Sequence, residues 1–541
     1  MRPRLRKLRS SLTVTVAFVS VVAVASLRAE QSAAAQLDAA IAMFWAATSD
    51  DEVVEARTAI LATEPDIEAV WSRLRTGRTY ERDVPTGRQL LVRDNSDGTV
   101  HEYAALIPDG YDPDTRYPVR VYLHGGVARP KRENGQFWRN EERIAREDAI
   151  VVTPGGWAES LWWQESQIEN LAGILNDLKR TYNIDENRIF LLGISDGATG
   201  AYYQALKATT PWAAFLPFNG HPVVLANPAT AADGDMHVTN LRNKPLFVIN
   251  GGRDPLYPTS SVVPYMRLFQ NAGIMVDFRP QPNAGHDMSW WEKEAPAMDA
   301  FMAEWTRRPM PPRLSWETER VDRYNRSHWL VIDELGSVSG EPELNAYNAI
   351  VDPTQAIPLG INRLGELQDG TGLRIFEVGE ASMASAAGMV DDDTIIEVDG
   401  QLNPSGEDLK QALLGFAPGQ HIPLAVLRGG ERLELTLDYP AGAATRSREA
   451  FPQTRQSGRV ELDQRRNHVT AYTRGVTRFT LLLSPEQFDF TQPITVVTNG
   501  VTVVDDVVEP DVEALLRWAA IDQDRTAIFG AALEIKVQAE Q

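Results

Sequence analysis

The chain contains no cysteine, so a disulfide framework, a lipid-modified cysteine and a thiolate metal site are excluded. Basic residues are fewer than acidic ones: the chain has 53 Lys and Arg and 74 Asp and Glu, and its formal net charge is −21. This excess of negative charge disfavours nucleic acid and anionic lipid as partners. The chain is long enough, at 541 residues, to form several globular domains that need no disulfides.

A long apolar run is missing as well. The most apolar stretch, Leu12–Val24, is too short and too close to the N-terminus for a convincing membrane span. It follows a basic segment that includes Arg2 and Lys7, and small residues up to Ala25 resemble a cleavage site. We therefore expect a signal peptide over residues 1–25, and a bacterial protein exported to the periplasm or beyond, without a stable membrane anchor after cleavage. A retained N-terminal anchor is the alternative.

The most informative segment present is Asn187–Tyr203, which contains a G-x-S-x-G pattern centred on Ser195. A short apolar strand precedes the pattern and a helix is predicted after it. In this context the serine is held exposed on a strained turn and acts as a nucleophile. The glycines at 193 and 197 allow the strand and the helix to approach each other. An ordinary strand-to-helix turn is the alternative.

A nucleophilic serine needs a histidine that removes its proton and a carboxylate that orients the histidine. Asp254 follows a predicted buried strand, and His286 follows the next strand and a Pro/Gly loop. Both side chains should therefore lie with Ser195 at the carboxyl edge of a parallel sheet. Asp287 and Asp277 are the fallback acids, and Asp287 is disfavoured because a neighbour in sequence can rarely face Nδ1 of the histidine.

The reaction also requires an oxyanion hole. The predicted strand Val119–Leu123 ends in His124-Gly125-Gly126-Val127, which resembles an oxyanion turn. We assign the two donors as the backbone N–H groups of Asp196 and Gly126, and we expect His124 to hold the loop. The Asp196 carboxylate would oppose an oxyanion, so we expect it to point into the helix N-terminus.

These motifs give the segment from about Gly98 to Arg307 a resemblance to the esterase and depolymerase branch of the α/β-hydrolase family. That branch holds secreted polyhydroxybutyrate-depolymerase-like and feruloyl-esterase-like enzymes. The resemblance implies hydrolysis of an ester through an acyl-enzyme, without metal or organic cofactor. The motifs that match are LHGG at 123–126, GISDG at 193–197, NGGRDPLYP at 250–258 and NAGHD at 283–287.

Apolar residues at helical spacing predict a small helical module over residues 33–80, packed on the hydrolase domain at 85–308. A Met-Pro-Pro run near Pro311 marks the boundary of that domain. Five tryptophans near the motifs offer an apolar or sugar-stacking wall, and we expect about half of them to be core. They are Trp157, Trp162, Trp163, Trp290 and Trp291.

Residues 355–440 resemble a bacterial PDZ domain, through the strand at 372–378, a short small-residue helix, and DDTIIEVDG at 392–400. The resemblance implies a carboxylate-binding loop at Leu359, Gly360 and Ile361, where backbone N–H groups capture the C-terminus of a peptide or protein. A packed spacer is the alternative. The flanks, 313–351 and 445–541, are predicted to form one small β-rich domain into which the PDZ domain is inserted.

The expected fold class is therefore α/β, an α/β-hydrolase fold with a PDZ domain and a small β-rich domain. We expect an exported serine esterase whose PDZ domain binds a substrate or partner. A serine peptidase and a non-catalytic PDZ-based binding protein are the alternatives.

Overall fold

The computed structural model describes residues 33–132, 135–336, 340–352, 359–367, 370–414, 416, 419–441 and 446–538. The predicted signal peptide, 1–25, lies outside these residues. Within the described residues, no helix combines the length and apolar character that a membrane crossing requires.

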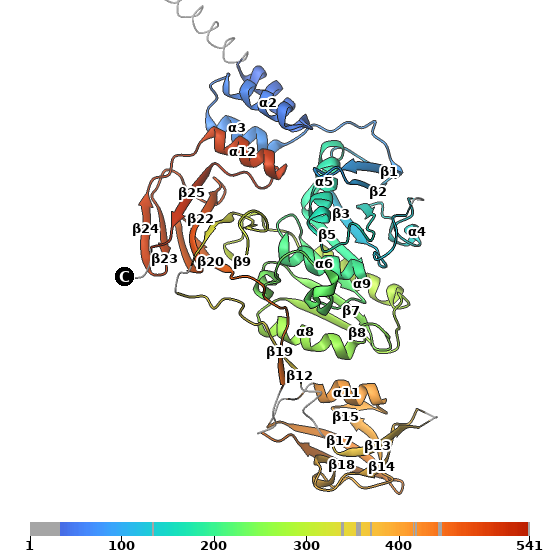
Figure 1. Cartoon of the computed structure of the whole chain (residues 1–541). Coiled ribbons are helices and arrows are strands. Elements are labelled where there is room, and N and C mark those ends of the chain that lie inside the picture. Colours follow the sequence, from blue (N-terminus) through green and yellow to red (C-terminus); the bar gives the residue numbers. More distant parts are fainter. Residues whose placement is uncertain are drawn as a thin grey trace, which may run out of the picture.

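An eight-stranded sheet forms the centre of the first part of the chain (Figure 1). Its first two strands form a hairpin that joins the sheet antiparallel, and all later strands are parallel. This is the α/β-hydrolase fold, so the predicted fold class is confirmed. In sheet order the strands are β1 (Gly87–Asp94), β2 (Val100–Ile107), β4 (Ile150–Pro154), β3 (Tyr117–Leu123), β5 (Ile184–Ile194), β6 (Ala214–Phe218), β7 (Leu246–Gly251) and β8 (Val276–Gln281).

Helices cover both faces of this sheet, because alternate side chains of each inner strand point to opposite faces. On β7, Leu246 and Val248 face one cluster while Phe247 and Ile249 face the other. The first cluster is closed by α5, α6 and α8, and the second mainly by α9. The helices are α4 (Glu141–Ile144), α5 (Glu165–Thr181), α6 (Asp196–Lys207), α7 (Val223–Ala226), α8 (Thr259–Asn271) and α9 (Trp291–Glu304), with 3-10 turns η1 (Pro228–Thr230) and η2 (Val238–Asn243).

The N-terminal helices form their core with the C-terminal part of the chain, not with the hydrolase domain as expected. Residues 33–46 are helical, followed by α2 (Asp50–Leu61) and α3 (Ile67–Thr76), and their apolar side chains share a core with α12 (Val512–Asp522). Figure 1 shows the blue N-terminal helices beside the red α12. The reason is that α12, which the sequence analysis did not anticipate, presents the fully buried side chains of Leu515, Leu516 and Ala519 to them.

The two flanks, 313–351 and 445–541, contribute strands to the same two sheets. One sheet has the order β24-β23-β21-β20-β9 and the other β10-β11-β22-β25. Strands from the two flanks are hydrogen-bonded to each other in both, and they enclose one core. The strands are β9 (Arg313–Thr318), β10 (Arg326–Ser327), β11 (Leu330–Leu335), β20 (Gly458–Arg465), β21 (His468–Arg474), β22 (Val476–Leu483), β23 (Ile494–Thr498), β24 (Val501–Asp506) and β25 (Ala531–Lys536).

Residues 359–441, here called the inserted unit, form a separate sheet with its own core. The ribbon of β12 (Ala349–Asp352) and β19 (Arg446–Glu449) joins it to the rest of the molecule (Figure 1). Its helix α11 also contacts α8. The elements are β13 (Ile361–Glu366), β14 (Leu373–Val378), α10 (Met383–Ala386), β15 (Thr394–Val398), β16 (Gln401–Leu402), α11 (Gly406–Leu414), β17 (His421–Arg428) and β18 (Glu431–Asp438).

Candidate active site

Ser195 lies on the turn between β5 and α6, in a strained backbone conformation with φ 57° and ψ −119°. A non-glycine residue at positive φ is uncommon and persists only where the surroundings hold it. Here the Ser195 N–H donates to the carbonyl of Phe218, at the end of β6, over 3.0 Å. Glycine is required at 193 and 197, because a Cβ at either position would meet neighbouring backbone atoms. The strand and helix thus pack closely around a half-buried serine.

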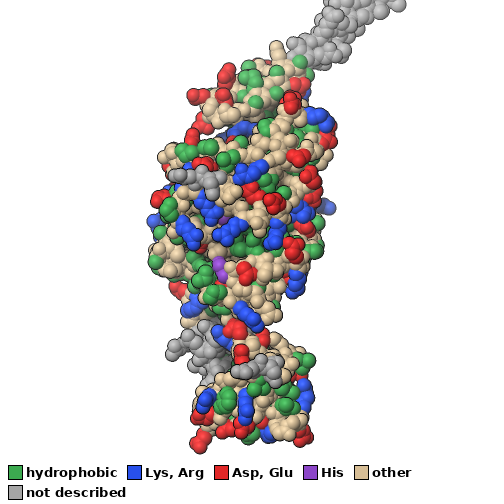
Figure 2. Space-filling model, turned by 90° about the vertical axis from the view of Figure 1, so that its right-hand side faces the viewer, with side chains coloured by type: hydrophobic (Ala, Val, Ile, Leu, Met, Phe, Trp, Pro, Cys, Tyr) green, Lys and Arg blue, Asp and Glu red, His purple; other side chains and the backbone are tan. Residues whose placement is uncertain are grey.

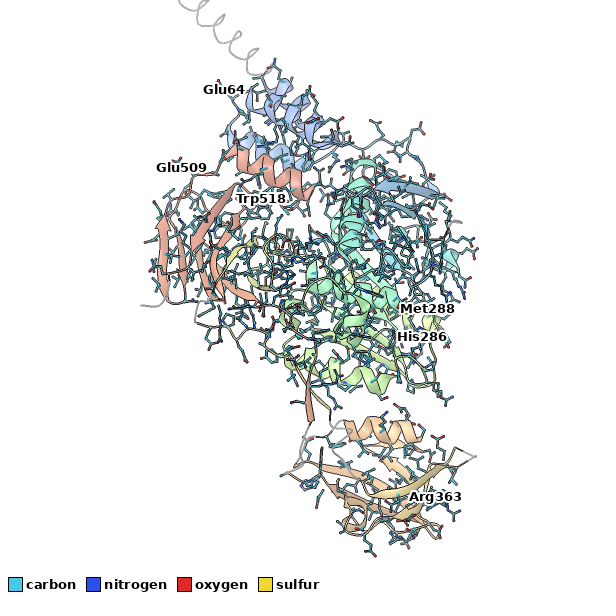
Figure 3. The ribbon with its side chains drawn as sticks, in the orientation of Figure 1. Glu64, His286, Met288, Arg363, Glu509 and Trp518 are labelled. Atoms are coloured by element: carbon cyan, nitrogen blue, oxygen red, sulfur yellow. The ribbon has the colours of Figure 1, made fainter. Side chains whose placement is uncertain are left out.

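His286 bridges Ser195 and Asp254. Its Nε2 lies 2.9 Å from Ser195 Oγ, and its Nδ1 lies 2.7 Å from Asp254 Oδ2. Because an ionised carboxylate only accepts hydrogen bonds, Nδ1 carries the proton and Nε2 is free to accept the serine hydroxyl. Figure 3 shows His286 on the loop after β8, beside Met288. The structure therefore brings together the three side chains that were predicted to act together.

Hydrogen bonds to the second carboxylate oxygen, Oδ1, fix the side chain of Asp254. Oδ1 accepts the backbone N–H groups of Leu256 at 2.8 Å and Tyr257 at 3.0 Å, and the residue is 1% exposed. These donors stabilise the charged carboxylate in a site closed to water. Both fallback acids lie elsewhere: Asp287 is exposed and accepts the Ser289 N–H, and Asp277 pairs with Arg279 on β8.

The loop after β3 packs directly on the serine. A Cβ at Gly125 would lie 2.8 Å from Ser195 Cβ, so no larger residue fits there without displacement. Gly126 follows at φ +73°, a conformation that glycine adopts without strain. Asp196 is the first residue of α6, and the N–H groups of a first helical turn have no partner within the helix. Both predicted oxyanion donors therefore belong to backbone that flanks Ser195.

The Asp196 carboxylate is oriented differently from our expectation. It accepts the backbone N–H of Val127 over 2.9 Å, and so ties the loop after β3 to the start of α6. The loop passes close enough to the helix terminus to supply its own donor, which the sequence does not reveal. One oxygen of the Asp196 carboxylate is therefore hydrogen-bonded to the loop.

His124 anchors the same loop from inside the protein. Gly156 donates its N–H to Nε2 over 3.0 Å, which leaves Nδ1 protonated and 2.9 Å from the carbonyl of Gly125. Trp162 Nε1 donates to the His124 carbonyl. Burial lowers the pKa of His124 to about 4, so the ring is neutral at pH 7. These contacts agree with a structural role for this histidine.

The five tryptophans proposed as a wall are all buried, with exposed fractions of 7% or less. They are core residues here rather than an open binding surface.

Tyr257, which we did not single out from the sequence, lies against His286 with ring centroids 5.9 Å apart. Its position in the sequence, three residues after Asp254, was the only indication that it would lie near the site. Burial raises the pKa of its hydroxyl. Among the described residues, no group of three or more His, Asp or Glu side chains has the arrangement of a metal site.

The predicted peptide-binding loop lies at the start of β13, far along the chain from the serine. Gly360 has φ +69°, and a Cβ there would overlap Ser382 at the start of α10. The Leu359 carbonyl accepts the Ala384 N–H over 2.9 Å, and Ile361 begins the strand. Strand β13 is at the edge of its sheet, paired with β14 alone among the described strands.

Comparison with known proteins gives partial matches. No family model matches the chain. A bifunctional acetylxylan esterase/xylanase of Neocallimastix patriciarum is 25% identical over 201 residues, which are 36% of this chain and 26% of that protein. The chain thus spans about a quarter of the length of this curated relative.

Solved structures that match cover about two fifths of this chain. A thermostable esterase is 20% identical and has a TM-score of 0.32, with 41% of this chain and 63% of that chain covered. A ferulic acid esterase is 17% identical with a TM-score of 0.33, over 40% and 98% of the two chains. An acylaminoacyl peptidase of Pyrococcus horikoshii is 15% identical with a TM-score of 0.34, over 42% and 44%.

Proposed function

We propose that the protein is an exported serine hydrolase that cleaves carboxylic esters through an acyl-enzyme. The observation that carries this proposal is the hydrogen-bonded series from Ser195 Oγ through His286 to Asp254 Oδ2, at 2.9 and 2.7 Å. Nucleophile, base and orienting acid lie at the carboxyl ends of β5, β8 and β7, where open α/β sheets build their sites.

In the proposed reaction His286 Nε2 takes the proton of Ser195 as Oγ attacks the carbonyl carbon of the ester. The carbonyl π bond breaks and its electron pair moves to oxygen, which gives a tetrahedral oxyanion. His286 then passes the proton to the leaving alcohol as the carbon–oxygen bond breaks. Water, activated by the same nitrogen, releases the acid from Ser195. Asp254 holds Nδ1–H throughout and stabilises the transient imidazolium.

The backbone N–H groups of Asp196 and Gly126 are the proposed oxyanion donors. The first adds the partial positive charge at the N-terminus of α6. The bond from Val127 N–H to the Asp196 carboxylate restrains that negative side chain on the loop. Stabilisation of the oxyanion is in general the largest single contribution of such sites.

An ester is favoured over a glycosidic bond by the chemistry of these residues. The partly matching relative is named for an esterase and a xylanase activity. Glycoside hydrolysis uses two carboxylates that flank the bond, whereas the present site has a serine, a histidine and one buried acid. The esterase activity is therefore the one that suits this site. A peptidase of the same architecture is the competing proposal, and substrates separate the two.

The inserted unit is proposed to be a PDZ domain that binds the C-terminus of a peptide or protein. The edge position of β13 among the described strands and the Gly360 turn before it support this, because an extended peptide can add to an edge strand while a turn captures its carboxylate. Fluorescence anisotropy with peptides that have a free or an amidated C-terminus tests it. Equal binding of both peptides would contradict carboxylate capture.

The hydrolase proposal is tested by steady-state kinetics with p-nitrophenyl butyrate and with peptide p-nitroanilides. We expect the wild-type protein to hydrolyse the ester with the higher kcat/KM. Ser195→Ala should lose this activity, while Ser289→Ala, an exposed serine on the loop beside His286, should retain it. A higher kcat/KM for the anilides would favour the peptidase. No activity on either class would favour a non-catalytic binding protein.

A further inference from the structure

Three arginines gather on the chain segment that follows the proposed oxyanion loop; they are here called the arginine cluster (Arg129, Arg132 and Arg139). A Cβ built at Gly126 would lie 3.8 Å from both Cζ and Nε of Arg129, so this guanidinium lies over the loop itself. Burial, and then the charges of Arg139 and Arg129, lower the pKa of Arg132. The three positive charges are therefore close enough to repel one another.

Within the described residues, the guanidinium groups of Arg129 and Arg139 have no hydrogen bond or ion pair, and both residues are exposed. Arg132 donates to the carbonyl of Gln136. The Asp196 carboxylate, at the start of α6, accepts the N–H of Val127, and no ion pair joins it to Arg129 within the described part of the chain. Two arginines without an acidic partner among the described residues are unexpected in a chain whose acidic residues outnumber its basic ones, 74 to 53.

Arg129 lies near the serine, because both contact neighbouring residues of the same loop. Figure 3 places His286 on the right-hand side of the molecule, and Figure 2 shows that side, on which Lys and Arg side chains are mixed with acidic ones. A Cβ at Gly125 would lie 3.4 Å from Ser195 Oγ, and Gly126 is the next residue. The path from the serine hydroxyl runs through the Gly125 contact, the 3.8 Å between consecutive Cα atoms and the Gly126 contact to the Arg129 guanidinium. Its length limits the distance between the two groups to about 14 Å. One substrate molecule can span this distance.

We propose that Arg129 binds an anionic group of the substrate, so that the preferred substrates are esters that carry a carboxylate or phosphate near the scissile bond. The proposal rests on the proposed ester hydrolysis and adds a substrate class to it. A guanidinium matches the two oxygens of such a group with parallel N–H donors, and the bond strengthens when substrate excludes water from the loop. Uncompensated positive charge beside the site also attracts anionic esters from solution.

The test compares anionic and neutral esters of matched shape. On the alcohol side the pair is p-acetoxybenzoate and p-acetoxybenzamide, and on the acyl side it is mono-p-nitrophenyl glutarate and p-nitrophenyl butyrate; p-acetoxyphenyl phosphate replaces carboxylate by phosphate. The measured quantity is the ratio of kcat/KM for the anionic ester to that for the neutral ester. We expect a ratio above one for at least one pair in the wild-type protein, and a fall of about tenfold in Arg129→Gln.

Arg116→Gln is the matched control, because Arg116 is an exposed arginine with no described partner just before β3, at the opposite end of that strand from the loop. It should leave the ratio unchanged. Raising the ionic strength from about 20 mM to about 500 mM should lower the wild-type ratio and have little effect on Arg129→Gln. Arg129→Lys keeps the charge but loses the planar pair of donors, so it should give an intermediate ratio.

A wild-type ratio of one or less for every pair, or a ratio that Arg129→Gln leaves unchanged, would overturn the proposal. If the protein still hydrolyses the neutral ester and this activity requires Ser195, either result would contradict the substrate class but not the proposed hydrolase function. Failure to hydrolyse any of the esters would instead remove the hydrolase proposal and the substrate class with it. A purely structural role for Arg129 would change both kcat/KM values by the same factor and leave the ratio constant.

Discussion

Gly125→Ala is the substitution whose effect follows most directly from the packing of the loop on the serine. The added Cβ would lie 2.8 Å from Ser195 Cβ and 3.1 Å from the carbonyl oxygen of Ile194. Two carbon atoms rest at about 3.5–4.0 Å. The loop and the serine must therefore separate by about 1 Å, and this movement displaces either Ser195 Oγ or the proposed donor at Gly126.

The size of the effect follows from that displacement. A misplacement of about 1 Å between reacting groups costs about 100-fold in rate, so kcat/KM for p-nitrophenyl butyrate should fall by about that factor. The same overpacking should cost about 1–3 kcal/mol in the free energy of unfolding, which leaves the domain folded. The rate loss should thus far exceed any loss of folded protein.

Kinetics and chemical denaturation of the same preparation measure both quantities. Gly110→Ala is the control, because a Cβ at Gly110 meets nothing within 4 Å and its φ is negative. It should match the wild-type protein in both assays. A folded Gly125→Ala protein with kcat/KM within threefold of wild type would refute the inference that this loop fixes the nucleophile.

Three further predictions concern other parts of the molecule. Asp254→Asn should lower kcat about 10⁴-fold with little change in KM, because the histidine loses its orienting partner, while Asp277→Asn should leave both constants unchanged. The pKa of His124 is about 4 in the fold and near 6.5 when unfolded, so the unfolded chain binds the extra proton between these values, and His124 should lower the free energy of unfolding by about 2 kcal/mol from pH 7 to pH 5. Burial lowers the pKa of His101 and His221 to about 4 as well, so the total fall, measured by urea denaturation, should exceed this contribution. Leu516→Ala should cost about 2–5 kcal/mol and expose the N-terminal helices to limited proteolysis, whereas Ile521→Ala, 57% exposed on the same helix, should not.

Each of these has a contrary outcome. Equal kcat values for the two aspartate variants would separate Asp254 from the reaction. Stability that rises on acidification from pH 7 to pH 5 would contradict a neutral, buried His124. Protease resistance of residues 33–76 in Leu516→Ala would show that α12 does not hold the N-terminal helices.

The fold class was predictable because short apolar strands recur through the hydrolase-fold part, each followed by a loop or turn that carries a motif residue. Strand positions such as Val119–Leu123 fall within β3, since both faces of a parallel strand are buried and the apolar run is continuous. The order of Ser195, Asp254 and His286 along the chain indicated which side chains would share one sheet edge. The structure brings the three within hydrogen-bond distance, and their catalytic role stays a prediction.

Contacts between distant segments were not predictable from local pattern. Asp511 caps α12 by accepting the N–H groups of Glu513 and Ala514, a signal that the sequence contains but that lies among predicted strands. Its partners, the N-terminal helices, are more than 400 residues away in the sequence. The periodicity of their apolar residues shows that each helix buries one face, but it does not show which segment covers that face. The bond from Val127 to Asp196 depends in the same way on how a loop passes a helix end.

The most direct test of the central claim is to label the protein with a fluorophosphonate probe and to map the adduct by peptide mass spectrometry. Such probes form a covalent bond with a serine that an adjacent base activates. We expect one modified peptide, which carries the adduct on Ser195, and no labelling of Ser195→Ala or of protein unfolded beforehand. An unlabelled wild-type protein, or an adduct that persists at another residue in Ser195→Ala, would contradict that claim.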